Sequence, residues 1–367
     1  MTTRINSLGI PMATCLLAAC LSAAAWAGEI HVPAEEPTIQ DAIDAAQGDD
    51  EIIVAPGRYK ESVDLKGKSI TVRSEKGPAV TIIDGSGNPD SVLKCISGEG
   101  PSTRIDGFTV TGGTGYGGLY SPEETVGGGL VCINSSPTIV NCTFVENTAT
   151  YHGGGIYNGR RANTVIRNCK VQANEAERGG GIFNTNGAPE AHGTEIRGNI
   201  ARHGGGGMYN YASDARVVDC SFTKNKARFN GGAIYDYNSN GEVVRCSFNE
   251  NVAMLSGNAM YRGYRSATAV DSDCRFVTVY DNIAGSGAYM LARGRPTGGC
   301  CIGGGCLIVE ESACTKAGGL WLGAGSDCDE QSLLDCPQPV AGDINSDGAV
   351  DMMDLVLLMT NMNETGN

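Results

Sequence analysis

Side chains that could bind a metal ion gather between residues 343 and 354. They occupy positions 1, 3, 5, 9 and 12 of a twelve-residue loop with glycine at position 6, and an alanine at position 7 offers its backbone carbonyl. This many oxygen ligands suit a hard cation. The sequence therefore predicts a Ca²⁺ site, with an acidic turn before a short helix as the alternative. The predicted ligands are Asp343, Asn345, Asp347, Ala349, Asp351 and Asp354.

A second candidate set is aromatic and recurs every 26 residues, each time directly after an aliphatic residue. Successive side chains of a strand point to opposite faces. If the aliphatic residues face a core, the aromatic ones form an outward ladder suited to stacking against sugar rings. The alternative is that they are packed under a corner or in the interior. The set comprises Tyr157, Phe183, Tyr209, Tyr235 and Tyr261.

The histidines do not suggest a further metal site. His152 and His203 flank glycine runs about two repeats apart, which separates them by roughly 10 Å, too far to share one metal ion. We expect both to be solvated turn residues. Asp236 is interpreted as a variation in a polar stack, because preceding repeats carry asparagine at the same position, namely Asn158, Asn184 and Asn210.

The elements that position these residues follow from a repeat of 26 residues. Between glycine runs the chain alternates with period 2, as in Val218, Cys220 and Phe222 on one face, which indicates short strands. A fixed period of short strands predicts a parallel β-solenoid in which equivalent residues stack about 4.8 Å apart. Two columns define the repeat: Leu130, Ile156, Ile182, Met208, Ile234 and Met260, and Asn147, Asn174, Asn199, Asn225 and Asn251.

The recurring asparagines and glycines should form the corners of this solenoid. We expect each asparagine to adopt a left-handed conformation and its amide to bond to its equivalents in the neighbouring turns. The glycine runs should lie at another corner, where a positive φ or a close backbone approach is needed.

Two resemblances support this interpretation. Phrases such as Gly231-Gly232-Ala233-Ile234 with Phe248-Asn249-Glu250-Asn251 resemble the repeats of polymorphic outer membrane proteins. The segment from Pro37 to Ala46, followed by Ile52 to Tyr59, resembles the helical cap and first coil of pectin-lyase-like β-helices. They imply an all-β fold, a right-handed parallel β-helix over residues 28–299 with a short N-terminal capping helix.

Catalytic motifs of related enzymes are not found. The stretch from Gly57 to Glu61 matches the short Gly-x-Tyr-x-Glu motif of pectin methylesterases, but that family's catalytic phrases do not occur. The Asn-Thr-Asp and Gly-His-Gly phrases of polygalacturonase-like enzymes do not occur either. Acidic residues such as Asp219, Glu242 and Asp271 are scattered rather than repeated at 26-residue spacing. We interpret the Gly57–Glu61 match as a structural turn.

The cysteines divide into three groups. Cys15 and Cys20 lie in an N-terminal apolar segment. Seven lie in the solenoid, of which Cys142, Cys169, Cys220 and Cys246 share one position of the repeat, where we expect an interior apolar stack; the others are Cys95, Cys132 and Cys274. Six more fall within residues 300–338 without a C-x-x-C pair, which favours a disulfide module over a zinc site. This last group comprises Cys300, Cys301, Cys306, Cys314, Cys328 and Cys336.

The two ends of the sequence indicate where the protein acts. Residues 1–27 are typical of a signal peptide ending at Ala25-Trp26-Ala27, with lipoprotein processing at Cys20 as the alternative. No transmembrane segment is expected in the mature chain. From residue 301 onward there are 11 acidic residues and one basic residue, out of a net charge of −14 for the whole chain. A nucleic-acid partner is therefore not expected.

Residues 339–367 resemble a dockerin repeat, with the calcium loop followed by a short helix. A dockerin has two such repeats and this chain has one, which argues against docking to a cohesin. The sequence predicts a secreted or cell-surface, non-catalytic β-helix acting in extracellular binding or adhesion to a polysaccharide or a surface protein, with Ca²⁺ as cofactor. The alternative is a polysaccharide lyase or glycoside hydrolase acting on an extracellular polysaccharide.

Overall fold

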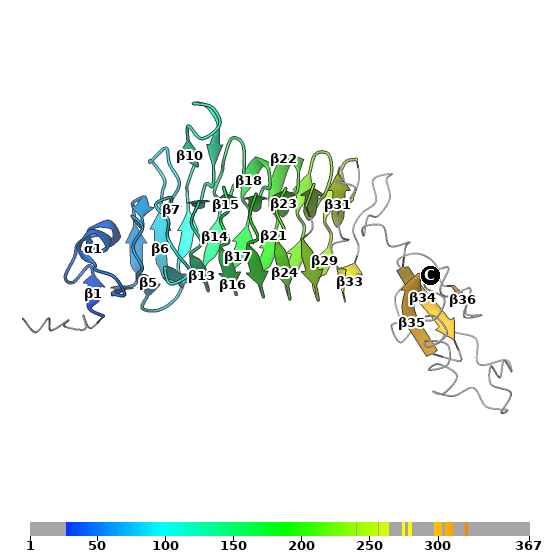
Figure 1. Cartoon of the computed structure of the whole chain (residues 1–367), viewed down its shortest axis with the longest axis horizontal. Coiled ribbons are helices and arrows are strands. Elements are labelled where there is room, and N and C mark those ends of the chain that lie inside the picture. Colours follow the sequence, from blue (N-terminus) through cyan, green and yellow to red (C-terminus); the bar gives the residue numbers. More distant parts are fainter. Residues whose placement is uncertain are drawn as a thin grey trace, which may run out of the picture.

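The computed structural model describes residues 27–239, 241–255 and 257–263, together with short strands within 274–280, 297–310 and 320–321. The described strands between Glu29 and Tyr280 form a parallel β-helix of about nine turns. Figure 1 shows its course. Most turns contribute one strand to each of three parallel sheets, here named sheets A, B and C. The predicted all-β solenoid is confirmed.

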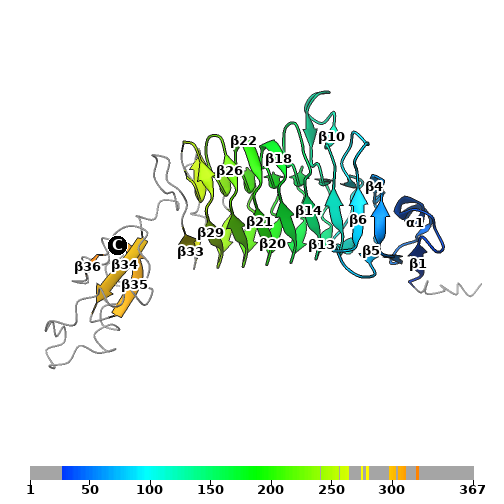
Figure 2. The ribbon, with the colours of Figure 1, turned by 180° about the vertical axis from the view of Figure 1, so that it is seen from behind.

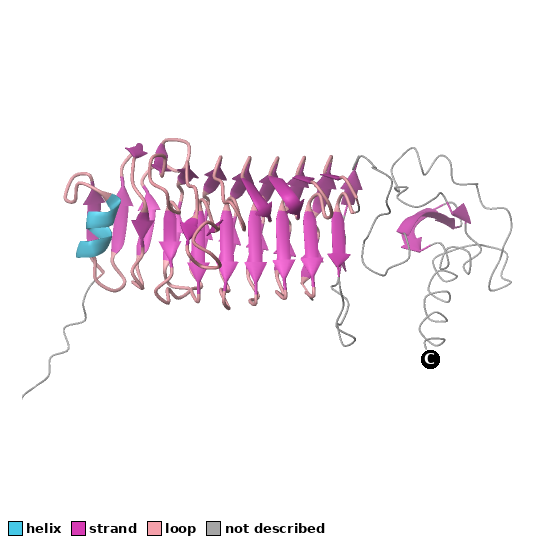
Figure 3. Cartoon of the chain, turned by 90° about the horizontal axis from the view of Figure 1, so that it is seen from above, coloured by secondary structure: helices cyan, strands magenta, loops and turns pink. Residues whose placement is uncertain are grey.

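The strands of each sheet follow one another along the solenoid axis in chain order (Figure 3). Sheet A contains β1 (Glu29–Val32), β2 (Glu51–Val54), β5 (Thr71–Ser74), β8 (Arg104–Asp106), β13 (Thr138–Val140), β16 (Val165–Arg167), β20 (Glu190–His192), β24 (Arg216–Val218), β28 (Glu242–Val244) and β32 (Cys274–Arg275). Sheet B contains β3 (Gly57–Tyr59), β6 (Thr81–Asp84), β9 (Thr109–Thr111), β14 (Thr143–Val145), β17 (Lys170–Gln172), β21 (Glu195–Arg197), β25 (Ser221–Thr223), β29 (Ser247–Asn249) and β33 (Thr278–Tyr280). Sheet C contains β4 (Val63–Asp64), β7 (Leu93–Cys95), β12 (Leu130–Ile133), β15 (Ile156–Gly159), β19 (Ile182–Thr185), β23 (Met208–Tyr211), β27 (Ile234–Tyr237) and β31 (Met260–Gly263).

Smaller sheets accompany the solenoid. Between sheets B and C the chain makes an excursion that forms a four-stranded parallel sheet, here named the arm sheet, from β18 (Glu175–Arg178), β22 (Ile200–Gly204), β26 (Lys226–Ala227) and β30 (Val252–Ala253). A hairpin of β10 (Tyr116–Gly117) and β11 (Thr125–Val126) rises on the same side (Figures 1 and 2). A separate antiparallel sheet comprises β34 (Thr297–Ile302), β35 (Gly305–Glu310) and β36 (Leu320–Trp321).

The predicted aliphatic column stacks in register in sheet C. Leu130 pairs with Ile156, and the same register continues to Met260 in β31. All six residues of this column are at most 3% exposed and belong to the main core. The cysteine column confirms the interior stack as well, because Cys142, Cys169, Cys220 and Cys246 are buried free thiols.

The asparagine column lines the corner after sheet B and is fully buried. Asn199 accepts the Asn174 backbone N–H (3.0 Å) and side-chain N–H (3.0 Å) at its Oδ1, while its own amide donates to the Val171 carbonyl (2.8 Å) and Asn225 Oδ1 (3.0 Å). The predicted amide ladder is confirmed. The expected left-handed conformation is wrong for the asparagines themselves, since the residue before each asparagine adopts it, as Ala173 (φ 53°) and Lys224 (φ 57°) do. The asparagine amide bonds to oxygens of the neighbouring turns, and the positive φ lies at the residue before it.

The glycine runs meet both predicted requirements. The first glycine of a run has positive φ, for example 66° at Gly153. The second approaches the next turn closely, because a Cβ at Gly154 would lie 2.5 Å from the Glu175 carbonyl oxygen. A side chain at either position would strain or separate neighbouring turns.

The N-terminal cap is helix α1 (Ile39–Ala45), which lies at the end of the solenoid in Figure 1. Thr38 caps its N-terminus by accepting the Asp41 N–H, and the Glu61 carboxylate accepts the N–H groups of Ile39 and Gln40. At the other end the Lys68 ammonium donates to the last carbonyls of the helix. Charges of these signs stabilise the helix dipole. The predicted cap is confirmed, and Glu61 of the Gly-x-Tyr-x-Glu motif has a structural role here.

Candidate functional site

The outer face of sheet C carries the aromatic column. Phe183 stacks on Tyr157 and Tyr209 with ring centroids 5.7 and 5.2 Å apart, so the rings do form a ladder. They form a second hydrophobic cluster separate from the main core. Tyr157, Phe183, Tyr209 and Tyr235 are only 1 to 7% exposed, and Tyr261 is half-buried. Of the two alternatives from the sequence, an exposed ladder and a packed one, the structure has the packed one.

The excursions between sheets B and C help to cover this ladder. The His152 ring lies between Tyr151 and Phe183, with centroids 3.7 and 3.8 Å away, and is 5% exposed. Burial, with a smaller contribution from the Arg178 charge, lowers the pKa of His152 to about 3. The expectation of a solvated His152 is therefore wrong. His203 is half-buried beside Phe229.

Tyr120, in the hairpin between β10 and β11, contacts the aromatic ladder at its N-terminal end. The hydroxyls of Tyr120 and Tyr157 lie 2.7 Å apart, and the Tyr120 ring meets His152 edge-on at 5.3 Å. Burial raises the pKa of Tyr157 well above its ordinary value. Both phenols are neutral near pH 7, so this contact is a neutral hydrogen bond that fixes the hairpin on the ladder.

The second outward column of sheet C changes character along the axis. Gly159 and Thr185 occupy it in β15 and β19, and tyrosines occupy it in β23 and β27. Tyr211 and Tyr237 stack with centroids 5.4 Å apart and an interplanar angle of 4°. Tyr211 is 45% exposed, while Tyr237 is partly buried against the aromatic ladder. Sequence reasoning missed this pair, although the alternation Tyr209-x-Tyr211 and Tyr235-x-Tyr237 places both columns on one face.

The interior face of the same strands holds a polar ladder. Asn158 donates to Asn184 (2.9 Å), Asn184 to Asn210 (2.7 Å), and Asn210 to the Asp236 carboxylate (2.7 Å). Asp236 is 2% exposed, which agrees with its interpretation as one member of a polar stack.

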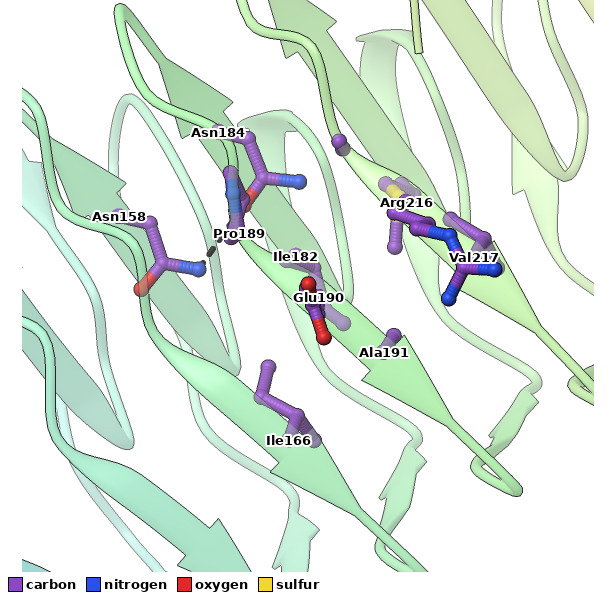
Figure 4. A pocket seen from close by; sticks show the side chains of 11 residues that line it. Asn158, Ile166, Ile182, Asn184, Pro189, Glu190, Ala191, Arg216 and Val217 are labelled. Carbon is purple, nitrogen blue, oxygen red and sulfur yellow. Dashed lines mark hydrogen bonds between the residues drawn. The ribbon is translucent and has the colours of Figure 1, made fainter. Parts of the chain in front are cut away.

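A void of about 10 Å³ lies beside the ladder, lined by Asn158, Asn184 and Ala191 among others (Figure 4). Ala191 stands where the neighbouring turns have Ile166 and Val217, which explains the gap. It is of the size of one water molecule and too small for a sugar.

Carboxylates on the outer faces are paired with bases of adjacent turns. Examples are Glu242 with Arg216 (2.8 Å) and Asp219 with Arg245 (2.6 Å). The hydrogen bond from Arg245 lowers the pKa of Asp219. A general acid requires a raised pKa, so Asp219 is poorly suited to that role. Within the described residues no group of three or more His, Cys, Asp or Glu could hold a metal ion.

Several predicted sites lie outside the described residues. They are the signal segment, the calcium ligands from Asp343 to Asp354, and Cys314, Cys328 and Cys336 of the cysteine module. In the part of the chain that the structure describes, no helix is both long and apolar enough to cross a membrane.

Residues 128–328 match the family described as "Right handed beta helix region", which is more than half of the chain. The protein therefore belongs to this family of right-handed β-helices. It is also similar to two structures of pectin methylesterase from Aspergillus niger. The penultimately deglycosylated form is 18% identical, covers 72% of this chain and 92% of that one, and gives a TM-score of 0.40. For the deglycosylated form the values are 15%, 73%, 87% and 0.37. No curated protein matches the chain. The family establishes the fold and leaves the activity open.

Proposed function

We propose that this protein is a secreted or cell-surface β-helix that binds an extracellular polysaccharide without cleaving it. The observation that supports this most is the stacked pair Tyr211 and Tyr237, one turn apart on the outer face of sheet C. A large aromatic side chain that is 45% exposed contributes little to the core and is suited to contact with a ligand. The C–H faces of sugar rings pack well against such rings.

The neighbours of the pair favour an extended ligand. In the same column Thr185 precedes Tyr211 and Gly263 follows Tyr237 in register, so no large side chain of this column flanks the two rings. The pair also rests on the buried ladder through Tyr235, whose ring meets Tyr237 edge-on at 6.5 Å. The two rings are thus a supported surface that runs along the solenoid axis.

The test is affinity electrophoresis of the full chain against a panel of neutral and acidic polysaccharides. We expect at least one to retard the wild-type protein, and the double variant Tyr211→Ala/Tyr237→Ala to lose at least tenfold in affinity for it, about 1.4 kcal/mol. Val80→Ala is the matched control, because Val80 is 46% exposed elsewhere on the surface. Retardation that the double variant retains in full contradicts the proposed surface.

The same panel tests the alternative of a polysaccharide lyase or glycoside hydrolase. Incubation with each polysaccharide followed by assays for reducing and unsaturated ends should show no release above the buffer blank. Sustained release by the purified protein would replace the binding function with an enzymatic one.

We further propose that the loop from Asp343 to Asp354 binds one Ca²⁺ ion. The support is the oxygen-ligand spacing of the sequence, with aspartate at position 12. Calorimetric titration of the full chain with Ca²⁺ should give one site, and Asp343→Ala/Asp347→Ala should abolish it. Equal Ca²⁺ binding by that variant would contradict the proposed ligands.

A further inference from the structure

Arg178, at the end of β18 in the arm sheet, is a half-buried cation with unusual partners. Its Nη1 lies 3.3 Å from Nε2 of His152, and its guanidinium lies 5.3 Å above the Tyr151 ring. Within the described residues no carboxylate makes an ion pair with it. The arginine of the following turn differs, because Arg202 pairs with Glu175 at 2.8 Å.

The partners of Arg178 position the guanidinium without neutralising its charge. His152 is buried and has its pKa lowered to about 3, so it is neutral and accepts the arginine N–H at Nε2. A face-on ring such as that of Tyr151 stabilises a cation only modestly. A partly desolvated charge that lacks a counter-ion is costly, and an anion that binds to it removes that cost.

The next turn brings the Tyr235 ring against the residue that pairs with Arg178. Arg178 pairs in register with Gly204, which has no side chain, and the Tyr235 ring packs against the Gly204 backbone. A Cβ at Gly204 would lie 2.6 Å from Cδ1 of that ring. Arg178 also acts electrostatically on the phenols of Tyr209 and Tyr235, partly opposing the rise in their pKa that burial causes. The cation therefore borders the aromatic ladder on which Tyr237 rests.

The surrounding arm sheet is basic in a chain of net charge −14. Residues 175–178 together with 200–204 and 226–228 carry Arg178, Arg202, Lys226 and Arg228 against Glu175 and Glu177. The ion pair with Glu175 neutralises Arg202, whereas Arg178 acts electrostatically on Tyr209 and Tyr235. This distribution of charge is complementary to an anionic ligand rather than to a neutral one.

We propose that Arg178 is the anion-binding subsite of the polysaccharide-binding face, holding the carboxylate or sulfate group of one sugar while a neighbouring sugar packs on Tyr237 and Tyr211. This inference rests on the proposed function and deepens it, because it makes the ligand an anionic polysaccharide. The planar guanidinium fork matches either oxyanion with two parallel hydrogen bonds, so carboxylate and sulfate share the relevant chemistry.

The test uses three polymers with one backbone: dextran, carboxymethyl-dextran and dextran sulfate. We expect the wild-type full chain to bind at least one of the anionic derivatives about tenfold more tightly than dextran, and Arg178→Gln to reduce that affinity to the dextran level. Arg178→Lys should restore only part of the affinity, because lysine keeps the charge and loses the fork. Arg202→Gln is the matched control and should bind as the wild type does. The derivative that responds to Arg178→Gln identifies the group, carboxylate or sulfate.

The outcomes separate the two proposals. If Arg178→Gln and wild type bind the anionic derivatives equally, or if dextran binds as tightly as they do, the anion subsite is refuted. Binding that only Tyr211→Ala/Tyr237→Ala removes would still support the polysaccharide-binding face. If neither the dextrans nor any member of the wider panel binds, the proposed function fails and the subsite with it. Unfolding curves of all variants, expected to show a folded protein under the binding conditions, exclude loss of fold as the cause.

Discussion

The two faces of sheet C use the same repeat in opposite ways. On the inner face β15, β19, β23 and β27 each place an aliphatic residue and a polar residue of the Asn158–Asp236 ladder, and these residues pair with their equivalents in neighbouring turns. On the outer face one column is uniformly aromatic in β15 to β31, whereas the adjacent column changes from Gly159 and Thr185 to Tyr211 and Tyr237. Regularity on the inside therefore serves stability, and the departure on the outside marks where a ligand can be recognised.

The largest loss of stability should come from breaking the amide ladder of the asparagine column at the corner after sheet B. Asn199→Ala removes the acceptor of the Asn174 N–H and a donor to the Val171 carbonyl in a fully buried corner. We expect a loss of about 3 kcal/mol or more in the free energy of unfolding. Urea denaturation measures it, with Asn249→Ala on the outer face of β29 as the control. Equal midpoints for the two variants would mean that the ladder does not stabilise the fold.

Acidic pH should lower the free energy of unfolding, because His152 is buried against the aromatic ladder. The folded-state pKa of His152 is about 3 against an ordinary 6.5, so between these values the unfolded chain binds a proton that the folded one does not. Stability is complete above pH 6.5 and should fall by about 1.4 kcal/mol for each pH unit below it, about 3 kcal/mol at pH 4. Comparing denaturation at pH 7 and pH 4 for wild type and His152→Phe isolates this contribution. His31→Phe, at an exposed histidine, is the control, and an unchanged pH dependence in His152→Phe contradicts the prediction.

A smaller loss of stability should follow from placing a side chain against the Tyr235 ring on the outer face of sheet C. Gly204→Ala places a methyl group 2.6 Å from the Tyr235 ring, which must move. We expect a loss of about 2 kcal/mol, typical of overpacking, without a change in the inner ladder. Gly100→Ala is the control, because a Cβ at Gly100 meets nothing within 4 Å. If both variants unfold at the same urea concentration, the ring is less closely packed than described.

The smallest expected effect is an increase in the free energy of unfolding. Ala191→Val fills the void beside Asn158 and Asn184, where the turns above and below already carry larger residues. We expect a rise of up to about 1 kcal/mol in the free energy of unfolding. Val217→Ala, which enlarges the same void, should destabilise by more than that. A destabilised Ala191→Val would mean that the void holds a bound water molecule.

The repeat made the interior predictable, because each column contains one residue type whose role is set by its equivalents. The spacing of Ile156, Ile182 and Ile234 was sufficient to predict the strands, the register and the buried face. The exterior was harder to predict, since burial of Tyr157 and Phe183 depends on excursions whose course no local pattern encodes. Tyr211 and Tyr237 were missed because they interrupt a column instead of continuing one. His152 looked like a turn residue, although two aromatic rings enclose it.

The separation of a stabilising interior from a binding exterior is tested most directly by measuring affinity and stability on one variant. For Tyr211→Ala/Tyr237→Ala, we predict at least a tenfold loss of affinity for the polysaccharide that binds the wild type, with a smaller loss of stability than Asn199→Ala causes. Unchanged affinity, or a loss of affinity that only accompanies unfolding, would contradict the assignment of this outer face to ligand binding.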